Sequence, residues 1–182
     1  MSRTEYFAPR DLFGPGQTGA IRDLLQSLFA AELLKPSKRL WLVFGWISDV
    51  EILDNRARQF SSLKPDWPAT GIRLSAVINE LIERGGRVAL VLRDVEHNHF
   101  FIEKLKAIRA MHLELPGHLQ FTLDLDVHEK GILADDFLLS GSMNLTSNGI
   151  TVNDEHLTLR IDKASVEEWR LVLEQKWGSL LV

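Results

Sequence analysis

Residues 128–144 read His-Glu-Lys-Gly-Ile-Leu-Ala-Asp-Asp-Phe-Leu-Leu-Ser-Gly-Ser-Met-Asn. Two apolar runs flank Asp135-Asp136, which is typical of a β-hairpin, and we predict strands over 128–133 and 137–141. Residues two apart on a strand point to the same face, so His128 and Lys130 would project side by side. An imidazole next to a fixed positive charge suits nucleophilic attack on an anionic phosphodiester.

This stretch resembles the signature of the phospholipase D superfamily, which is His-x-Lys, four residues, Asp, and later Gly-Ser-x-Asn. The matching positions are His128, Lys130, Asp135, Gly141, Ser142 and Asn144. Glu155 follows at the place where single-motif nucleases of the superfamily carry a Glu beside the histidine. The resemblance implies an α/β fold, an α-β-α sandwich around a mixed central sheet.

The resemblance also implies a role for each polar side chain of the site. His128 would attack phosphorus and form a phosphohistidine, without a metal or other cofactor. Lys130 and Asn144 would bind the non-bridging oxygens, and Ser142 would add a hydrogen bond. Glu155 would accept from the other ring nitrogen of His128 and so fix its tautomer.

Some positions of the signature carry alternatives or structural roles. Asp135 is expected to hold the hairpin, and Gly141 belongs with it as a structural position. Ser142 and Asn144 are also common turn formers. Asp154 adjoins Glu155, and only one of this pair can face inward.

The chain carries one copy of the motif, whereas long members of the superfamily carry two and build one site from both. The resemblance therefore implies a homodimer in which two His128 side chains meet across a two-fold axis.

The remaining sequence alternates helical and apolar strand patterns, which predicts an α/β layered domain over 1–182. The predicted helices cover 19–34, 74–84, 98–111 and 164–181, and the predicted strands cover 40–47, 87–93, 119–125 and 156–161. Residues 1–16 are expected to be irregular, and 49–70 to form a long polar loop.

Composition narrows the class of protein. The 182 residues are 45% hydrophobic, contain no Cys and carry a formal net charge of −4. No apolar run is long enough for a membrane span, and the first residues lack an apolar signal-peptide core, so we expect a cytoplasmic protein without stable membrane association. An acidic balance does not exclude a nuclease, because a local basic groove can coexist with it.

The predicted loop offers candidate substrate contacts. Arg56, Arg58 and Lys64 would line a nucleic-acid path, with Phe60 and Trp67 as stacking platforms. A solvated loop is an equal alternative.

Two weaker candidates lie outside this loop. Ser48 and Asp49 follow the first buried strand, where α/β sheets often place substrate contacts. His97 and His99 could suggest a metal pair, although a polar strand-to-helix loop is the favoured interpretation and no metal site is predicted.

Three classes of function stay open at this level. The first is a nuclease acting on DNA or RNA. The stretch 46–56 also looks like phospholipase D-like proteins of bacterial phage-defence clusters, such as DpdK, which would imply defence-system partner proteins. The second is a lipid phosphodiesterase with phospholipase D activity, and the third is a non-catalytic interaction subunit that keeps the fold.

Overall fold

The computed structural model describes residues 8–12, 16–151 and 155–181. Within these residues, seven strands form one mixed sheet in the order β1-β9-β8-β7-β2-β5-β6. Their bounds are β1 Arg10–Leu12, β2 Leu40–Phe44, β5 Val88–Leu92, β6 Leu119–Leu123, β7 Gly131–Leu133, β8 Leu138–Gly141 and β9 Leu157–Arg160. The strands β2, β5 and β6 run parallel, and all other neighbours in this sheet are antiparallel.

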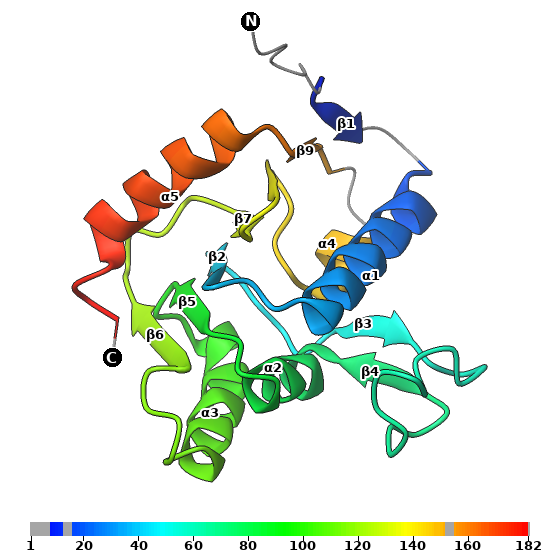
Figure 1. Cartoon of the computed structure of the whole chain (residues 1–182). Helices are drawn as coiled ribbons and strands as arrows, with labels where there is room; N and C mark the ends of the chain where they lie inside the picture. Colours follow the sequence, from blue (N-terminus) through cyan, green and yellow to red (C-terminus); the bar gives the residue numbers. More distant parts are fainter. Residues whose placement is uncertain (1–7, 13–15, 152–154, 182) are drawn as a thin grey trace, which may run out of the picture.

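The helices cover both faces of the sheet (Figure 1). Their bounds are α1 Thr18–Leu34, α2 Leu74–Glu83, α3 Glu96–Met111, α4 Ser147–Thr151 and α5 Lys163–Trp177. Side chains of β2 alternate between two hydrophobic clusters, because successive residues of a strand point to opposite faces. Leu42 packs with α1, α2 and α3, whereas Trp41 and Val43 pack with α5. The result is an α-β-α sandwich around a mixed sheet, as the sequence predicts.

The long helices and buried strands fall close to their predicted positions. The apolar runs of β2 and β5 are buried at every position, which explains why they read as short continuous hydrophobic segments rather than alternating ones. The predicted hairpin also forms, but β7 begins at Gly131, so His128 and Lys130 lie in the segment just before the strand. The elements β1 and α4 were not predicted, because three- and five-residue elements are too short to show a period.

The prediction of a plain loop over 49–70 is wrong. β3 (Glu51–Asp54) pairs with β4 (Gly71–Arg73) as a separate two-stranded sheet, and the connection between them folds back on the core. Asn55 is fully buried and organises this connection. Its amide donates to the Pro68 carbonyl oxygen at 2.8 Å, and its side-chain oxygen accepts from the Phe60 N–H at 3.0 Å.

Candidate active site

Three segments that carry polar residues of the signature lie at one end of the sheet, next to the end of β2. These are the segment before β7, the end of β8 with the residues that follow it, and the segment before β9. The pairing fixes this meeting, because Val43 lies opposite Gly131 and Gly141 lies opposite Leu157. The sheet topology therefore brings together residues that lie up to 27 positions apart in the signature, from His128 to Glu155.

His128 and Lys130 lie on the segment that leads into β7. The His128 side chain is exposed, and the Lys130 Nζ donates to the His128 carbonyl oxygen at 2.9 Å. The ammonium therefore lies against the backbone of the histidine, although neither residue is part of the strand.

Glu129 lies between these two residues and faces a different element. Its Oε1 forms an ion pair with the Lys176 Nζ on α5 at 2.6 Å. Burial opposes ionisation of Glu129, but the hydrogen bond and charge of Lys176 and the hydrogen bonds from backbone N–H groups together outweigh it and hold the pKa below its ordinary value. This contact ties the segment to α5 without using the side chains of His128 or Lys130.

Asn144 reaches the end of β2. Its Oδ1 accepts from the Trp46 N–H at 3.1 Å. A Cβ added at Gly45 would stand 3.3 Å from the Val127 carbonyl oxygen and 3.7 Å from Asn144 Oδ1, so Gly45 allows both segments to approach closely. Because the side-chain oxygen is occupied by Trp46, the Asn144 amide NH₂ is the group available for an anionic ligand.

Ser142 and Glu155 form the second polar pair of the site. The Ser142 hydroxyl donates to Glu155 Oε2 and accepts from the His156 N–H at 3.0 Å. Glu155 is 9% exposed, so its carboxylate lies inside the protein, whereas Asp154 lies outside the described residues. The hydroxyl proton of Ser142 is thus directed at Glu155, which makes Ser142 a positioning residue for this carboxylate.

Gly141 permits the close approach of β8 and β9. A Cβ at this position would collide with the His156 carbonyl oxygen. The backbone at Ser142 pairs directly with that carbonyl, at 2.9 Å from N to O. A glycine is therefore required immediately before the Ser142–Glu155 pair.

Asp135 lies at the opposite end of the β7–β8 hairpin from His128. Its carboxylate accepts from the Lys38 N–H at 2.9 Å and pairs with Arg170 at 3.3 Å, while its own N–H donates to Ser37 Oγ at 2.8 Å. These contacts join the hairpin to the segment before β2 and to α5. They give Asp135 the contacts of a structural residue.

Asn98 is a polar residue of this region that the sequence did not single out. It is fully buried on α3, and its Oδ1 accepts from the Ile47 N–H at 2.9 Å. Its amide nitrogen donates to the carbonyl oxygens of Gly45 and Arg93, at 2.9 and 2.8 Å. One side chain thus fixes the chain on both sides of Trp46. No local pattern could have revealed it, because its partners at the end of β2 lie about fifty residues away in the sequence.

Ser48 lies beside the site, and Asp49 has a structural partner set. The Ser48 N–H donates to the Leu145 carbonyl oxygen at 2.9 Å, and its hydroxyl lies 3.0 Å from His97 Nε2. Asp49 is buried, accepts from the Ser75 N–H at 2.8 Å and pairs with Lys104 at 3.1 Å. Asp49 therefore anchors α2 and α3, and the interpretation of Asp49 as a substrate contact is wrong.

The arginines of the predicted path lie on the β3–β4 hairpin. Arg56 pairs with Glu51 at 2.9 Å and with Asp54 at 3.1 Å, and the hydrogen bonds that it donates, first to Glu51 and then to Asp54, raise its pKa above the ordinary value. Its side chain lines a cleft of about 700 Å³ that also includes Ser147 of α4, three residues after Asn144. Arg58 is exposed, with a positive φ of 56°, and is not among the residues that line this cleft.

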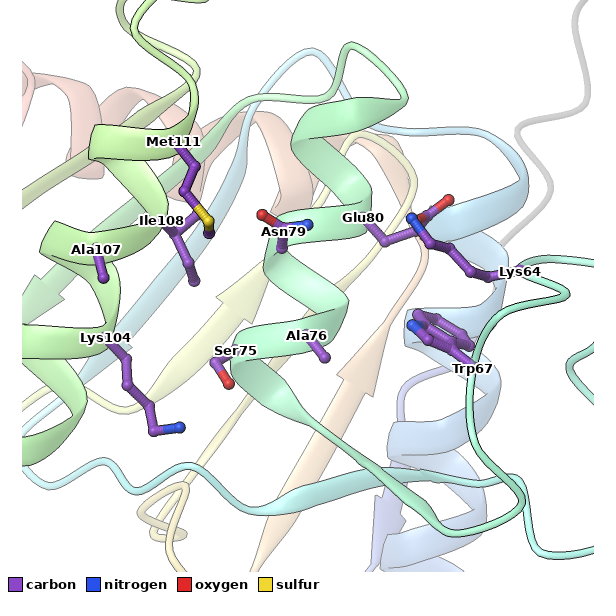
Figure 2. Close-up of a pocket in the computed structure, with 10 residues that line it drawn as sticks. All are labelled: Lys64, Trp67, Ser75, Ala76, Asn79, Glu80, Lys104, Ala107, Ile108 and Met111. Carbon is purple, nitrogen blue, oxygen red and sulfur yellow. The ribbon is translucent and has the colours of Figure 1, made fainter.

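The two aromatic side chains proposed for the same path pack against the core. Trp67 is only 7% exposed, and Phe60 packs against the main core. Figure 2 shows Trp67 and Lys64 at one side of a pocket of about 330 Å³ between α2 and α3. Lys64 pairs there with Glu80 at 2.6 Å. The prediction that Trp67 stacks bases is wrong, because the connection folds back and buries it, whereas Phe60 is partly buried by the same packing.

The described residues contain no group of three or more His, Asp or Glu side chains placed to hold a metal ion. Within these residues, His99 pairs with Asp94 at 3.5 Å. Among the helices in these ranges, none has both the length and the apolar character needed to cross a bilayer.

Comparison with known proteins identifies the family. Residues 65–177 match the family model described as "Cardiolipin synthase, PLD-like domain", which covers well over half of the chain. The chain therefore belongs to the phospholipase D-like family. No curated protein matches it.

Solved structures resemble the fold at low sequence identity. NucT from Helicobacter pylori is 14% identical, with a TM-score of 0.60 over 96% of this chain and 98% of that chain. Nuc from Salmonella typhimurium, a phospholipase D family member, is 16% identical, with a TM-score of 0.62 over 94% and 95%. The phosphatidylserine synthase of Haemophilus influenzae Rd KW20 is 20% identical, with a TM-score of 0.60 over 96% of this chain and 39% of that chain.

Proposed function

We propose that this protein is a metal-independent phosphodiesterase that cleaves DNA or RNA through a phosphohistidine on His128. The observation that carries the proposal is an exposed His128 whose backbone carbonyl oxygen accepts from the Lys130 ammonium, at the sheet end that also holds Asn144 and the buried Glu155. The likeness to NucT and Nuc over nearly their whole length supports a nuclease.

The reaction uses two imidazoles in opposite protonation states. A neutral His128 attacks phosphorus, and the new P–N bond forms as the P–O bond to the leaving oxygen breaks. The charged His128 of a second copy gives its proton to that oxygen. It then takes a proton from water, which attacks phosphorus and breaks the P–N bond. Because the two groups interact, their titrations belong to the pair, and activity is expected to follow a bell-shaped pH profile.

The remaining residues bind and orient. Lys130 and the amide nitrogen of Asn144 stabilise the charge that develops on the non-bridging oxygens. Glu155, held by Ser142, orients the His128 ring and fixes its tautomer. Ser48, Arg56 and Arg58 are proposed to contact the nucleic acid outside the reacting group.

A homodimer completes this site in the proposal. Each chain carries the signature once and so supplies one catalytic histidine, and the general acid must therefore come from a second copy. His128 is exposed in the isolated chain, which leaves it accessible to such a partner. The likeness of 46–56 to phage-defence proteins supports a role in antiviral defence with partner proteins, in the cytoplasm.

A lipid phosphodiesterase is the second candidate. The description of the matching family model and the similarity to a phosphatidylserine synthase favour it. Both candidates use the same attack on phosphorus, so the substrate distinguishes them.

The test is cleavage by wild type and His128→Ala, in EDTA, of labelled single- and double-stranded DNA, RNA and phospholipid vesicles. The nuclease proposal expects cleavage of a nucleic acid that is lost in the variant. Cleavage of phospholipid alone would favour the lipid phosphodiesterase. No His128-dependent cleavage of any substrate would favour a non-catalytic subunit.

A further inference from the structure

Trp46 combines an exposed side chain with a fixed backbone. Trp46 is 49% exposed, whereas Phe44 and Ile47, before and after it in the chain, are buried in the core. Asn98 binds the Gly45 carbonyl oxygen and the Ile47 N–H, both at 2.9 Å. The Trp46 N–H donates to Asn144 Oδ1 at 3.1 Å.

This arrangement is not explained by packing. Single exposed apolar residues are ordinary on protein surfaces and need no special account. Trp46 differs because a fully buried amide fixes its two neighbours, and because its own N–H orients the side chain proposed to bind phosphate. A large aromatic ring is thus held at the rim of the site without being buried for stability.

We propose that Trp46 is a stacking platform for a base of single-stranded nucleic acid, next to the phosphate held by Asn144. The inference rests on the proposed function and adds strandedness to it. A base and its phosphate are joined through one sugar, so an exposed ring on the residue whose backbone N–H binds Asn144 is close enough in the chain to meet the base of a phosphate held there. Bases in a duplex already stack on one another, whereas an unpaired base offers a free face to an aromatic side chain.

The polar surroundings favour a nucleic acid over a membrane. The Trp46 N–H donates to Asn144, and the hydroxyl of Ser48, two residues further along the chain, lies against His97. An indole at a lipid interface would also place an apolar side chain in contact with water, so vesicle binding is an outcome that the experiment must separate.

The experiment measures binding rather than cleavage. In a His128→Ala background and in EDTA, anisotropy gives the Kd for a labelled single-stranded oligonucleotide of about 12 nucleotides and for a fully abasic strand of equal phosphate charge. The variants added to this background are Trp46→Ala, Trp46→Phe and Leu34→Ala. Leu34 is the matched control, because it is also a large exposed apolar residue and precedes Lys35, which pairs with Asp136 at the opposite end of the sheet.

Trp46→Ala is expected to raise the Kd for the base-containing strand about 5- to 150-fold, the range expected for loss of one stacked base. The Kd for the abasic strand should stay unchanged, because that strand has nothing to stack. Trp46→Phe should keep most of the affinity, and Leu34→Ala should behave as the background.

Three results would overturn the inference. These are equal losses on both strands, no loss on either strand, or absence of binding to any single strand in the micromolar range. Loss of binding to phosphatidylglycerol vesicles without a change for oligonucleotides would assign the indole to a membrane instead. The wild-type cleavage assay is independent of these measurements. Base-dependent binding without His128-dependent cleavage would refute the nuclease proposal but support Trp46 as a stacking platform. His128-dependent cleavage with binding unaltered by Trp46→Ala would support the nuclease proposal but refute the stacking platform.

Discussion

Asn98→Asp tests whether one buried amide holds the end of β2 at the site. The wild-type side chain makes three hydrogen bonds, accepting one from Ile47 and donating two to the carbonyls of Gly45 and Arg93. The substitution keeps the shape and the acceptor but removes both donors. Each carbonyl that loses its donor costs about 1–3 kcal/mol, so the loss of stability for the two carbonyls is expected to be about 2–6 kcal/mol at neutral pH.

The loss should depend on pH in a direction that follows from burial. Burial and the two facing carbonyls disfavour the ionised form, so they raise the folded-state pKa of the introduced carboxyl above its unfolded value. The protonated form can donate one hydrogen bond again. The penalty should therefore be smallest below the unfolded pKa and should grow as the pH rises through the folded pKa.

Urea unfolding of the wild type and the variant measures both effects, at about pH 3.5, below the unfolded pKa of about 3.9, and at about pH 8. Asn79→Asp on α2 is the control, because Asn79 is only part-buried and its amide nitrogen donates to the exposed Glu83. The control should change stability by about 1 kcal/mol or less. If Asn98→Asp is as mild as the control at pH 8, Asn98 does not carry the structural role given to it.

Two further changes probe the sheet and its supports. Gly141→Ala forces a Cβ against the His156 carbonyl oxygen and should lower the free energy of unfolding in urea by at least about 2 kcal/mol. Gly19→Ala is the control, because its Cβ meets no atom within 4 Å, and it should leave the stability unchanged or slightly raised. Equal behaviour of the two variants would contradict the close approach of β8 and β9. The hydrogen bond from the Trp177 indole, and then that from a backbone amide, lower the pKa of Asp124, so its contribution is present above the unfolded pKa and is lost as pH falls through the folded pKa. Asp124→Asn should therefore flatten the decline in stability between about pH 4 and pH 2, and an unchanged slope would argue against this contact.

The layered fold was predictable because its main signals are local. The runs Leu40–Phe44 and Val88–Leu92 are continuous and apolar because each strand is buried on both faces. The order of these strands in the sheet depends on contacts between distant segments and was not predicted, since the resemblance implied only a mixed central sheet. The hairpin β3–β4 was missed because its strands are short and lie within a polar stretch.

The site residues also differ in whether the sequence alone could reveal them. The spacing of His128, Lys130 and Asn144 is visible in the sequence, whereas the clamp by Asn98 depends on contacts between distant segments. Choosing an aromatic platform from the sequence failed at Trp67 because exposure is a property of the folded chain. The connection that carries Trp67 folds onto the core, and the exposed ring is Trp46 instead.

The proposed reaction depends on attack of His128 on phosphorus. Wild type, His128→Ala and His118→Gln would be incubated in EDTA with DNA and RNA carrying a label on the phosphate, quenched in alkali and analysed for label bound to protein. His118 is the matched control, because its backbone pairs with Val88 at the other end of the sheet. We predict protein-bound label on the wild type and His118→Gln but not on His128→Ala. Nucleic-acid cleavage by His128→Ala at the wild-type rate, or label retained by that variant, would contradict the account.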